Sequence, residues 1–146
     1  MTSTTTTLTC AACHTTNRVP TDRINDKPKC GKCKLPILQG HPIELNYANV
    51  SSVLHGNSVP VLVDCWAPWC GPCRGFAPVF EQAAQQLEPR LRFAKLNTED
   101  EQQLGGEWGI QSIPTLILFR EGREEARMSG AMPLGQLKQW LLQQGV

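Results

Sequence analysis

The sequence lacks an apolar run long enough to cross a bilayer, and it lacks an excess of charge of either sign. Its longest apolar stretch, Val59 to Trp69, includes an aspartate and two prolines and is far shorter than the roughly 20 residues that a spanning helix needs. The 14 basic and 13 acidic side chains leave a formal charge of +1. Such a balance gives no field to gather the chain onto nucleic acid or an anionic membrane. We therefore expect neither a nucleic-acid partner nor a membrane partner.

The N-terminal segment MTSTTTTLT also lacks the basic start and the apolar stretch of a secretory signal. We therefore expect a cytoplasmic location, where thiols stay reduced and structural disulfides are rare. The seven cysteines of the chain are then predicted to be metal ligands or redox catalysts.

Two groups of cysteines divide the 146 residues into two units. The first 40 residues carry a charge of +4 and few large apolar side chains, whereas the remainder carries −3. A unit of about 40 residues usually needs a metal or disulfides to keep its fold. We expect a disordered tail at 1–9, a small metal-binding module at 10–40 and one domain at 41–146.

The residues from 41 onward alternate between strand and helix patterns, which predicts an α/β domain with a central, partly parallel sheet. A nearly continuous apolar run at 59–66 is typical of a strand buried on both faces. The other strands are expected at 43–45, 91–96, 115–119 and 123–128. The helices are expected at 46–55, with Asn46 as the cap, from Phe76 to before Pro89, at 98–108 through a capping box of Thr98 and Glu101, and after Pro133.

The strongest chemical signal is the pair Cys70 and Cys73, placed where the buried strand gives way to a helix. Free backbone amides and the helix dipole stabilise a thiolate at a helix start, so Cys70 is the predicted nucleophile. Cys73 lies one helical turn further on and is placed to resolve a mixed disulfide. The alternative interpretation of this pair is half of a zinc site.

Asp64 is a carboxylate inside the apolar strand that leads to this pair. Desolvation raises the pKa of such a group, which suits a proton acceptor for Cys73 near neutral pH. The alternative is a purely structural carboxylate.

These residues belong to a longer pattern that resembles the thioredoxin family over about residues 42–146. The pattern comprises VLVDCWAP, WCGPC, FAP, KLNTED, GIQSIPTLILF and SGAM. The resemblance implies the thioredoxin fold, a five-stranded mixed sheet flanked by helices, and disulfide exchange on protein substrates. It further implies a redox-active disulfide of Cys70 and Cys73, a buried acid at Asp64 and a charged neighbour at Lys95.

The resemblance also implies a substrate-docking rim and a reducing character. The rim would consist of Trp69, Ile113, Pro114, Gly130 and Ala131, with a cis peptide bond before the proline, although simple packing is an alternative for the large side chains. Gly71 and Pro72, between the two cysteines, imply a reductase. The rival hypotheses are a disulfide isomerase or oxidase, and an adaptor or holdase in which the domain only presents partners.

The remaining motif consists of Cys10, Cys13, Cys30 and Cys33, with sixteen residues between the two pairs. This spacing predicts a structural site for one zinc ion with four thiolate ligands. A second redox site is an alternative, whereas c-type haem attachment at the string CAACH would leave the second pair unexplained.

Together, the two units resemble the zinc-containing thioredoxins of bacteria, the thioredoxin 2 type. That resemblance implies a cytoplasmic monomer that takes electrons from NADPH through thioredoxin reductase, with a link to oxidative stress. It leaves open whether oxidation releases the zinc.

Overall fold

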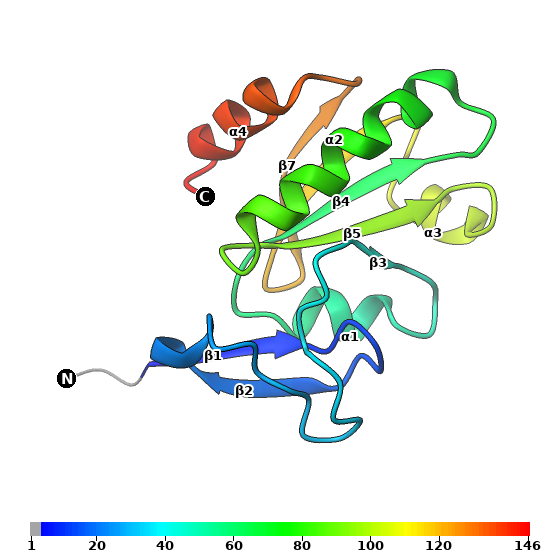
Figure 1. The fold of residues 1–146 in the computed structure, drawn as a ribbon. Helices are drawn as coiled ribbons and strands as arrows, with labels where there is room; N and C mark the ends of the chain where they lie inside the picture. The colour runs from blue at the N-terminus through cyan, green and yellow to red at the C-terminus, as the bar shows by residue number, and fades with distance from the viewer. Residues whose placement is uncertain (1–3) are drawn as a thin grey trace.

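The computed structural model describes residues 4–146, which form two sheets of different size. We refer to residues 4–40 as the N-terminal module and to residues 41–146 as the α/β domain. In Figure 1 the module lies beside the first helix of the domain, and the two have separate sheets. Within the described residues, no helix is long and apolar enough to cross a membrane.

The α/β domain is built on a five-stranded mixed sheet, as the sequence predicted. Its strand order is β3-β5-β4-β6-β7, with β3, β5 and β4 parallel and with β6 and β7 antiparallel to their neighbours. The strands are β3 (Ile43–Glu44), β4 (Val61–Trp66), β5 (Arg92–Asn97), β6 (Thr115–Arg120) and β7 (Arg123–Ser129).

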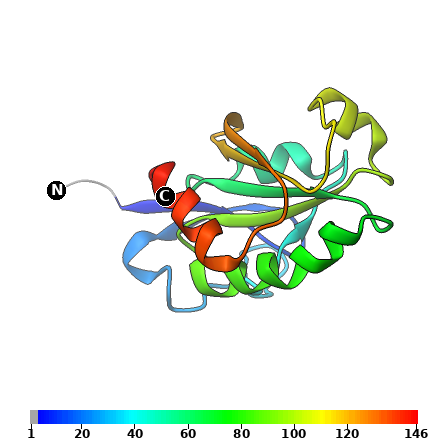
Figure 2. The same cartoon turned by 90° about the horizontal axis from the view of Figure 1, so that it is seen from above.

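Helices cover both faces of this sheet, because alternate residues of its buried central strand point to opposite sides. Val61 and Val63 pack in one cluster with α1 (Val50–His55) and α3 (Gln102–Glu107). Leu62, between them, packs in a second cluster with α2 (Gly71–Leu87) and α4 (Leu134–Gln143). Figure 2 shows the resulting three layers, with α2 and α4 on one side and α1 and α3 on the other.

Two predicted helix starts were wrong, because side chains there make other hydrogen bonds. Asn46 does not cap α1; it exchanges hydrogen bonds with Asn49 in a turn, and the helix begins only at Val50. The capping box at Thr98 is also absent, since its hydroxyl donates to the carbonyl of Trp66 at 3.0 Å. Helix α3 therefore begins at Gln102.

The N-terminal module begins with a hairpin that corrects the prediction of a disordered tail. Strand β1 (Thr5–Thr9) pairs antiparallel with β2 (Thr16–Pro20), which leads into a short 3-10 turn. Threonine is β-branched and suits a strand, and the side chains of Thr6 and Leu8 are buried in it. Residues 1–3 of the predicted tail lie outside the described residues.

Candidate functional site

Cys70 and Cys73 form a disulfide at the start of α2. Cys70 is the N-cap residue, and its sulfur accepts a hydrogen bond from the amide of Cys73 at 3.2 Å. Gly71 and Pro72 form the first turn of the helix, where a proline loses no hydrogen bond. The sulfur of Cys70 thus lies at the positive end of a 17-residue helix, which stabilises a thiolate there.

The two cysteines differ in their access to solvent. Cys70 is 5% exposed and Cys73 is 1% exposed, so the first is the more accessible of the pair. Trp69, directly before them, is 67% exposed and forms one wall of a groove of about 300 Å³. Ile113 also lines the groove, and its carbonyl oxygen lies 3.9 Å from the sulfur of Cys70.

Of the predicted rim residues, Trp69 and Ile113 line this groove, and Pro114 directly follows Ile113. The peptide bond between Ile113 and Pro114 is cis, as the resemblance implied. The carbonyl of Pro114 accepts a hydrogen bond from the amide of Gly130 at 2.8 Å. Gly130 has a φ of 104°, a value that favours glycine, and the exposed Ala131 follows it.

Sequence reasoning missed a group of hydroxyls that holds this loop in place. The hydroxyl of Thr115 donates to the backbone carbonyl of Ser112 at 2.6 Å. The hydroxyls of Thr115 and Ser112 each lie 3.2 Å from the hydroxyl of Ser129. Ser112 and Ser129 come from different segments, and no local spacing in the sequence relates them. The three side chains join the proline loop to β7.

Asp64 belongs to β4, the strand that precedes the disulfide along the chain, and is 1% exposed. Burial raises the pKa of its carboxyl group to about 7, and the positive charge of Lys95 partly opposes this shift. Among the described residues, neither carboxylate oxygen has a hydrogen-bond partner. Lys95 faces the neighbouring Trp66, with its amine 4.5 Å from the centre of that ring. This environment favours a carboxyl group that exchanges a proton near neutral pH.

The four N-terminal cysteines converge on one point, with all four sulfur atoms within 4.8 Å of one another. The sulfurs of Cys10 and Cys33 are 3.6 Å apart, as are those of Cys13 and Cys30. A tetrahedral ion with metal–sulfur bonds of about 2.3 Å separates its ligands by about 3.8 Å. The spacing therefore fits a closed metal site with four thiolates.

Backbone amides support two of these sulfurs in the same way. The sulfur of Cys10 accepts from the amides of Ala12 and Cys13 at 3.3 and 3.5 Å, and that of Cys30 accepts from the amides of Lys32 and Cys33 at the same distances. For Cys30 these amides, with the side chain of Asn17, lower the pKa of the thiol to about 6. For Cys33, by contrast, burial and the neighbouring sulfurs raise the pKa of the thiol to about 11. Thiolates are the metal-binding form of cysteine, so the backbone amides at Cys10 and Cys30 favour a bound metal ion, whose charge would offset the unfavourable approach of the sulfurs at Cys33.

Asn17 was not predicted as part of this site. Its amide nitrogen lies 3.5 Å from the sulfur of Cys30, and its carbonyl oxygen accepts from the amide of Gly31 at 2.9 Å. The residue belongs to β2, outside both cysteine pairs, so only the hairpin brings it to the site.

Comparison with known proteins agrees with both sites. A thioredoxin family model matches residues 41–143, and the model described as "Thioredoxin 2, N-terminal", a zinc ribbon, matches residues 9–34. Thioredoxin C-3 of Corynebacterium nephridii is 45% identical over 135 residues, which cover 92% of this chain and 92% of that protein. The thioredoxin of Haemophilus influenzae is 38% identical over 101 residues, or 69% of this chain and 94% of that protein.

A solved structure is similar as well. A mutant thioredoxin from Halobacterium salinarum superposes with a TM-score of 0.63 at 29% identity, covering 69% of this chain and 88% of that one. Thioredoxins are thiol-disulfide oxidoreductases, and Cys70 and Cys73 occupy the position of the active-site pair. The chain therefore belongs to the thioredoxin family, as a protein-disulfide reductase that carries the N-terminal zinc ribbon of the thioredoxin 2 type.

Proposed function

We propose that Cys70 attacks protein disulfides and that Cys73 resolves the product. The thiolate of Cys70 attacks one substrate sulfur, forms a mixed disulfide and expels the other substrate sulfur as a thiolate. Cys73 then attacks the sulfur of Cys70 and releases the second substrate thiolate. The substrate gains two electrons, and the protein is left with the Cys70–Cys73 disulfide. The observation that carries this assignment is the position of the more accessible Cys70 at the N-cap of α2.

We assign the proton transfer to Asp64. A carboxyl group with a pKa of about 7 holds and releases a proton at the pH at which Cys73 must become a thiolate. The charge of Lys95 keeps that pKa from rising further. Neither residue lines the groove beside Cys70, so both leave that groove free for the substrate.

The substrate chain is proposed to lie against the rim. The groove beside Cys70 is lined by Trp69, Ile110 and Ile113 and by polar and glycine residues without charge. Backbone groups next to Pro114 would bind an extended segment, and Gly130 and Ala131 would contact it on the far side. Residues 41–146 would then form the domain that binds and reduces the substrate, and residues 10–40 would form the module that holds the metal ion.

We propose that the metal is zinc, as one structural ion held by Cys10, Cys13, Cys30 and Cys33. Zinc favours four thiolates in a tetrahedral arrangement, and a closed site leaves no position for a substrate. The protein is further proposed to be a cytoplasmic monomer that recovers its dithiol form from NADPH through thioredoxin reductase, and to serve during oxidative stress.

Trapping the intermediate tests the assignment of roles. Cys73→Ser, mixed with insulin as the substrate, should accumulate a mixed disulfide that dithiothreitol releases, whereas Cys70→Ser should form none. Cys65→Ser is the matched control, because that thiol is fully buried away from the groove, and it should reduce insulin at the wild-type rate. Insulin reduction by Cys70→Ser would refute the proposal that Cys70 is the attacking thiol.

The reduction potential separates a reductase from its enzymatic rivals. We expect a value near about −270 mV for the Cys70–Cys73 pair in the metal-loaded protein. A value between about −180 and −120 mV would instead indicate an isomerase or an oxidase.

A further inference from the structure

Arg92 is a charged residue buried at the point where the zinc ribbon meets the thioredoxin domain. It begins β5 and is only 1% exposed. Its Nη1 donates to the carbonyl oxygen of Thr9 at 2.6 Å and to Oδ1 of Asn57 at 2.9 Å, and its Nε lies 3.4 Å from the carboxylate of Glu88. A buried guanidinium is costly unless such partners surround it. One of these partners, Thr9, belongs to the ribbon.

Thr9 directs all its polar groups towards the thioredoxin domain. Its amide donates to Oδ1 of Asn57 at 2.9 Å, and its hydroxyl donates to the carbonyl of Ser52 at 3.0 Å. Asn57 in turn donates to that hydroxyl at 3.0 Å and to the carbonyl of Val53 at 2.7 Å. With its carbonyl bound by Arg92, Thr9 is fully buried and fully hydrogen-bonded across the boundary.

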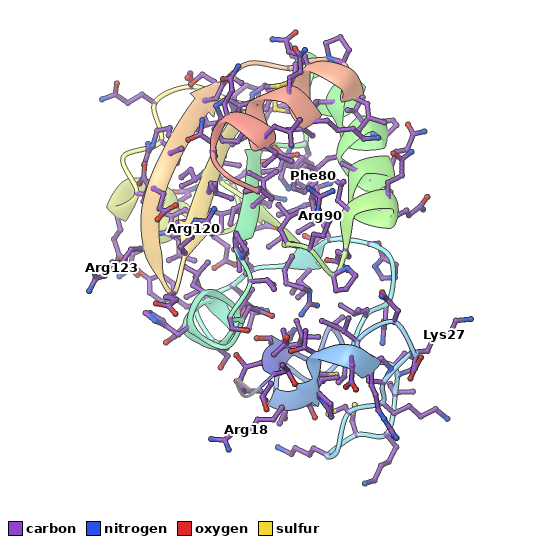
Figure 3. All side chains as sticks on the ribbon, turned by 90° about the vertical axis from the view of Figure 1, so that its left-hand side faces the viewer. Arg18, Lys27, Phe80, Arg90, Arg120 and Arg123 are labelled. Atoms are coloured by element: carbon purple, nitrogen blue, oxygen red, sulfur yellow. A yellow bond between two sulfur atoms is a disulfide. The ribbon has the colours of Figure 1, made fainter. Side chains whose placement is uncertain are left out.

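Thr9 directly precedes the metal ligand Cys10. The sulfur of Cys10 accepts hydrogen bonds from the backbone amides of Ala12 and Cys13. The position of Thr9 therefore fixes where the first pair of ligands begins. Other contacts also cross the boundary. Thr7 and Ser58 exchange hydrogen bonds at 3.0 Å, the side chains of His14 and Asn49 lie 3.4 Å apart, and Ala11 packs against the core of the domain. Two basic side chains of the ribbon, Arg18 and Lys27, extend outward from the molecule in Figure 3.

We propose that Arg92, a residue of the thioredoxin domain, is a positioning residue for the metal site of the ribbon, and that it couples metal binding to the folding of that domain. The guanidinium holds the carbonyl before Cys10 and so presents the first ligand pair in its binding geometry. The folded domain then raises metal affinity, and by linkage the bound metal stabilises the folded domain by the same amount. A ribbon that only decorates the domain would show neither effect.

The four tryptophans allow the two halves to be observed separately. Trp66, Trp69, Trp108 and Trp140 all lie beyond residue 41, so their fluorescence reports unfolding of the thioredoxin domain. The absorption of Co²⁺ bound to thiolates reports the ribbon. Both signals are measured on the reduced, full-length protein, and neither depends on disulfide chemistry.

Metal removal from the wild type is the first experiment. A chelator should lower the midpoint of the tryptophan transition by about 5 °C or more, the size expected when a few kcal/mol are lost from a domain of this length. An unchanged midpoint would overturn the proposal. Failure to bind Co²⁺ or Zn²⁺ at all would overturn it together with the metal assignment, whereas the assignment of Cys70 and Cys73 would stand.

The second experiment removes the buried charge pair. In the double variant Arg92→Met, Glu88→Gln, no unpaired charge is left, and the remaining amide oxygen can still accept from the amide of Phe93 as Glu88 does. We expect Zn²⁺ affinity, measured by competition with a chromophoric chelator, to fall about tenfold or more, as for other residues that support metal ligands. The metal-dependent shift of the tryptophan transition should shrink with it. Arg123→Met is the control, because that side chain is exposed on β7, and it should retain both wild-type values.

A third variant disturbs the contact between the ribbon and the domain without removing the charge of Arg92. It also provides a test if the double variant does not fold. A Cβ at Gly56 would lie 2.3 Å from the carbonyl oxygen of Ser52 and 2.6 Å from the hydroxyl oxygens of Thr9 and Thr16. Gly56→Ala therefore displaces the end of α1 and the ribbon from each other while Arg92 stays intact. It should weaken Zn²⁺ binding and lose the metal-dependent shift. Wild-type affinity and a full shift in either folded variant would refute the coupling.

Discussion

Asp64 and Lys95 lie opposite each other on the adjacent parallel strands β4 and β5, yet the carboxylate has no hydrogen-bond partner among the described residues. The lysine instead faces the ring of Trp66. Its charge reaches the carboxyl group without a contact, which lowers the pKa of that group only in part. This incomplete compensation is what leaves a buried acid poised near neutral pH.

The first prediction concerns the pH dependence of stability. Burial raises the pKa of Asp64 from 3.8 to about 7, so the folded state holds the proton more tightly than the unfolded state. The resulting stability is fully present below pH about 4 and is lost as the pH rises through about 7, a loss on the order of 4 kcal/mol. Asp64→Asn should remove this loss and be the more stable protein at pH 8.

Urea unfolding at several pH values between 4 and 8 measures this effect. Asp100→Asn is the control, because the carboxylate of Asp100 is exposed. This substitution should leave the pH profile unchanged. Parallel profiles for the wild type and Asp64→Asn would contradict the raised pKa.

The second prediction concerns Lys95. Its charge opposes the effect of burial on Asp64, so Lys95→Met should raise the pKa of the carboxyl group above that of the wild type. The pH midpoint for resolution of the mixed disulfide should then move to higher pH, and the rate at pH 7 should fall about threefold to tenfold. Stopped-flow measurement of the tryptophan signal gives this rate. Lys95→Arg, which keeps the charge, should retain the wild-type midpoint.

The third prediction concerns the remaining cysteine. Burial raises the pKa of Cys65 to about 12, and only the thiolate reacts with alkylating agents. At pH 8 the reduced protein should therefore be labelled by iodoacetamide at Cys70 well before Cys65, as read by peptide mass spectrometry. Labelling of Cys65 in the native protein at a rate similar to that of Cys70 would show that the strand opens.

The fourth prediction concerns the groove beside Trp69. Gly106 lines this groove, and a Cβ there has no heavy atom of another residue within 4 Å. Gly106→Leu should therefore fill the groove without strain and raise KM for insulin about tenfold. The rate with the small disulfide DTNB should not change. Gly135→Leu, on α4 and equally open, should affect neither substrate.

The α/β domain could be predicted from the sequence because its signals are local. The nearly continuous apolar run along 59–66 specifies a strand buried on both faces, and the helical spacing that begins at Phe76 specifies a helix with one buried face. The structure places both elements as expected. The cysteine pairs could be predicted for the same reason. Two cysteines separated by two residues can bring their sulfurs to one metal ion or to each other without help from distant parts of the chain.

What could not be predicted depends on partners distant in sequence. The hairpin of β1 escaped prediction because a threonine run has little apolar pattern, and its burial depends on Ile37 and other residues of the module. Asn46 and Thr98 look like caps when only their neighbours are considered, but they bond elsewhere. The contact of Thr9 with Arg92 spans 83 positions, and no motif announces it.

That separation also orders events on the ribosome. The hairpin and all four metal ligands leave the exit tunnel before Asn57, and Arg92 follows later still. On the proposed coupling, the nascent ribbon therefore first binds metal without the hydrogen bond from Arg92. The metal affinity of the ribbon should rise once β5, which carries Arg92, has emerged and joined the sheet. The metal centre should therefore reach its full affinity only after the thioredoxin domain has been translated and has folded.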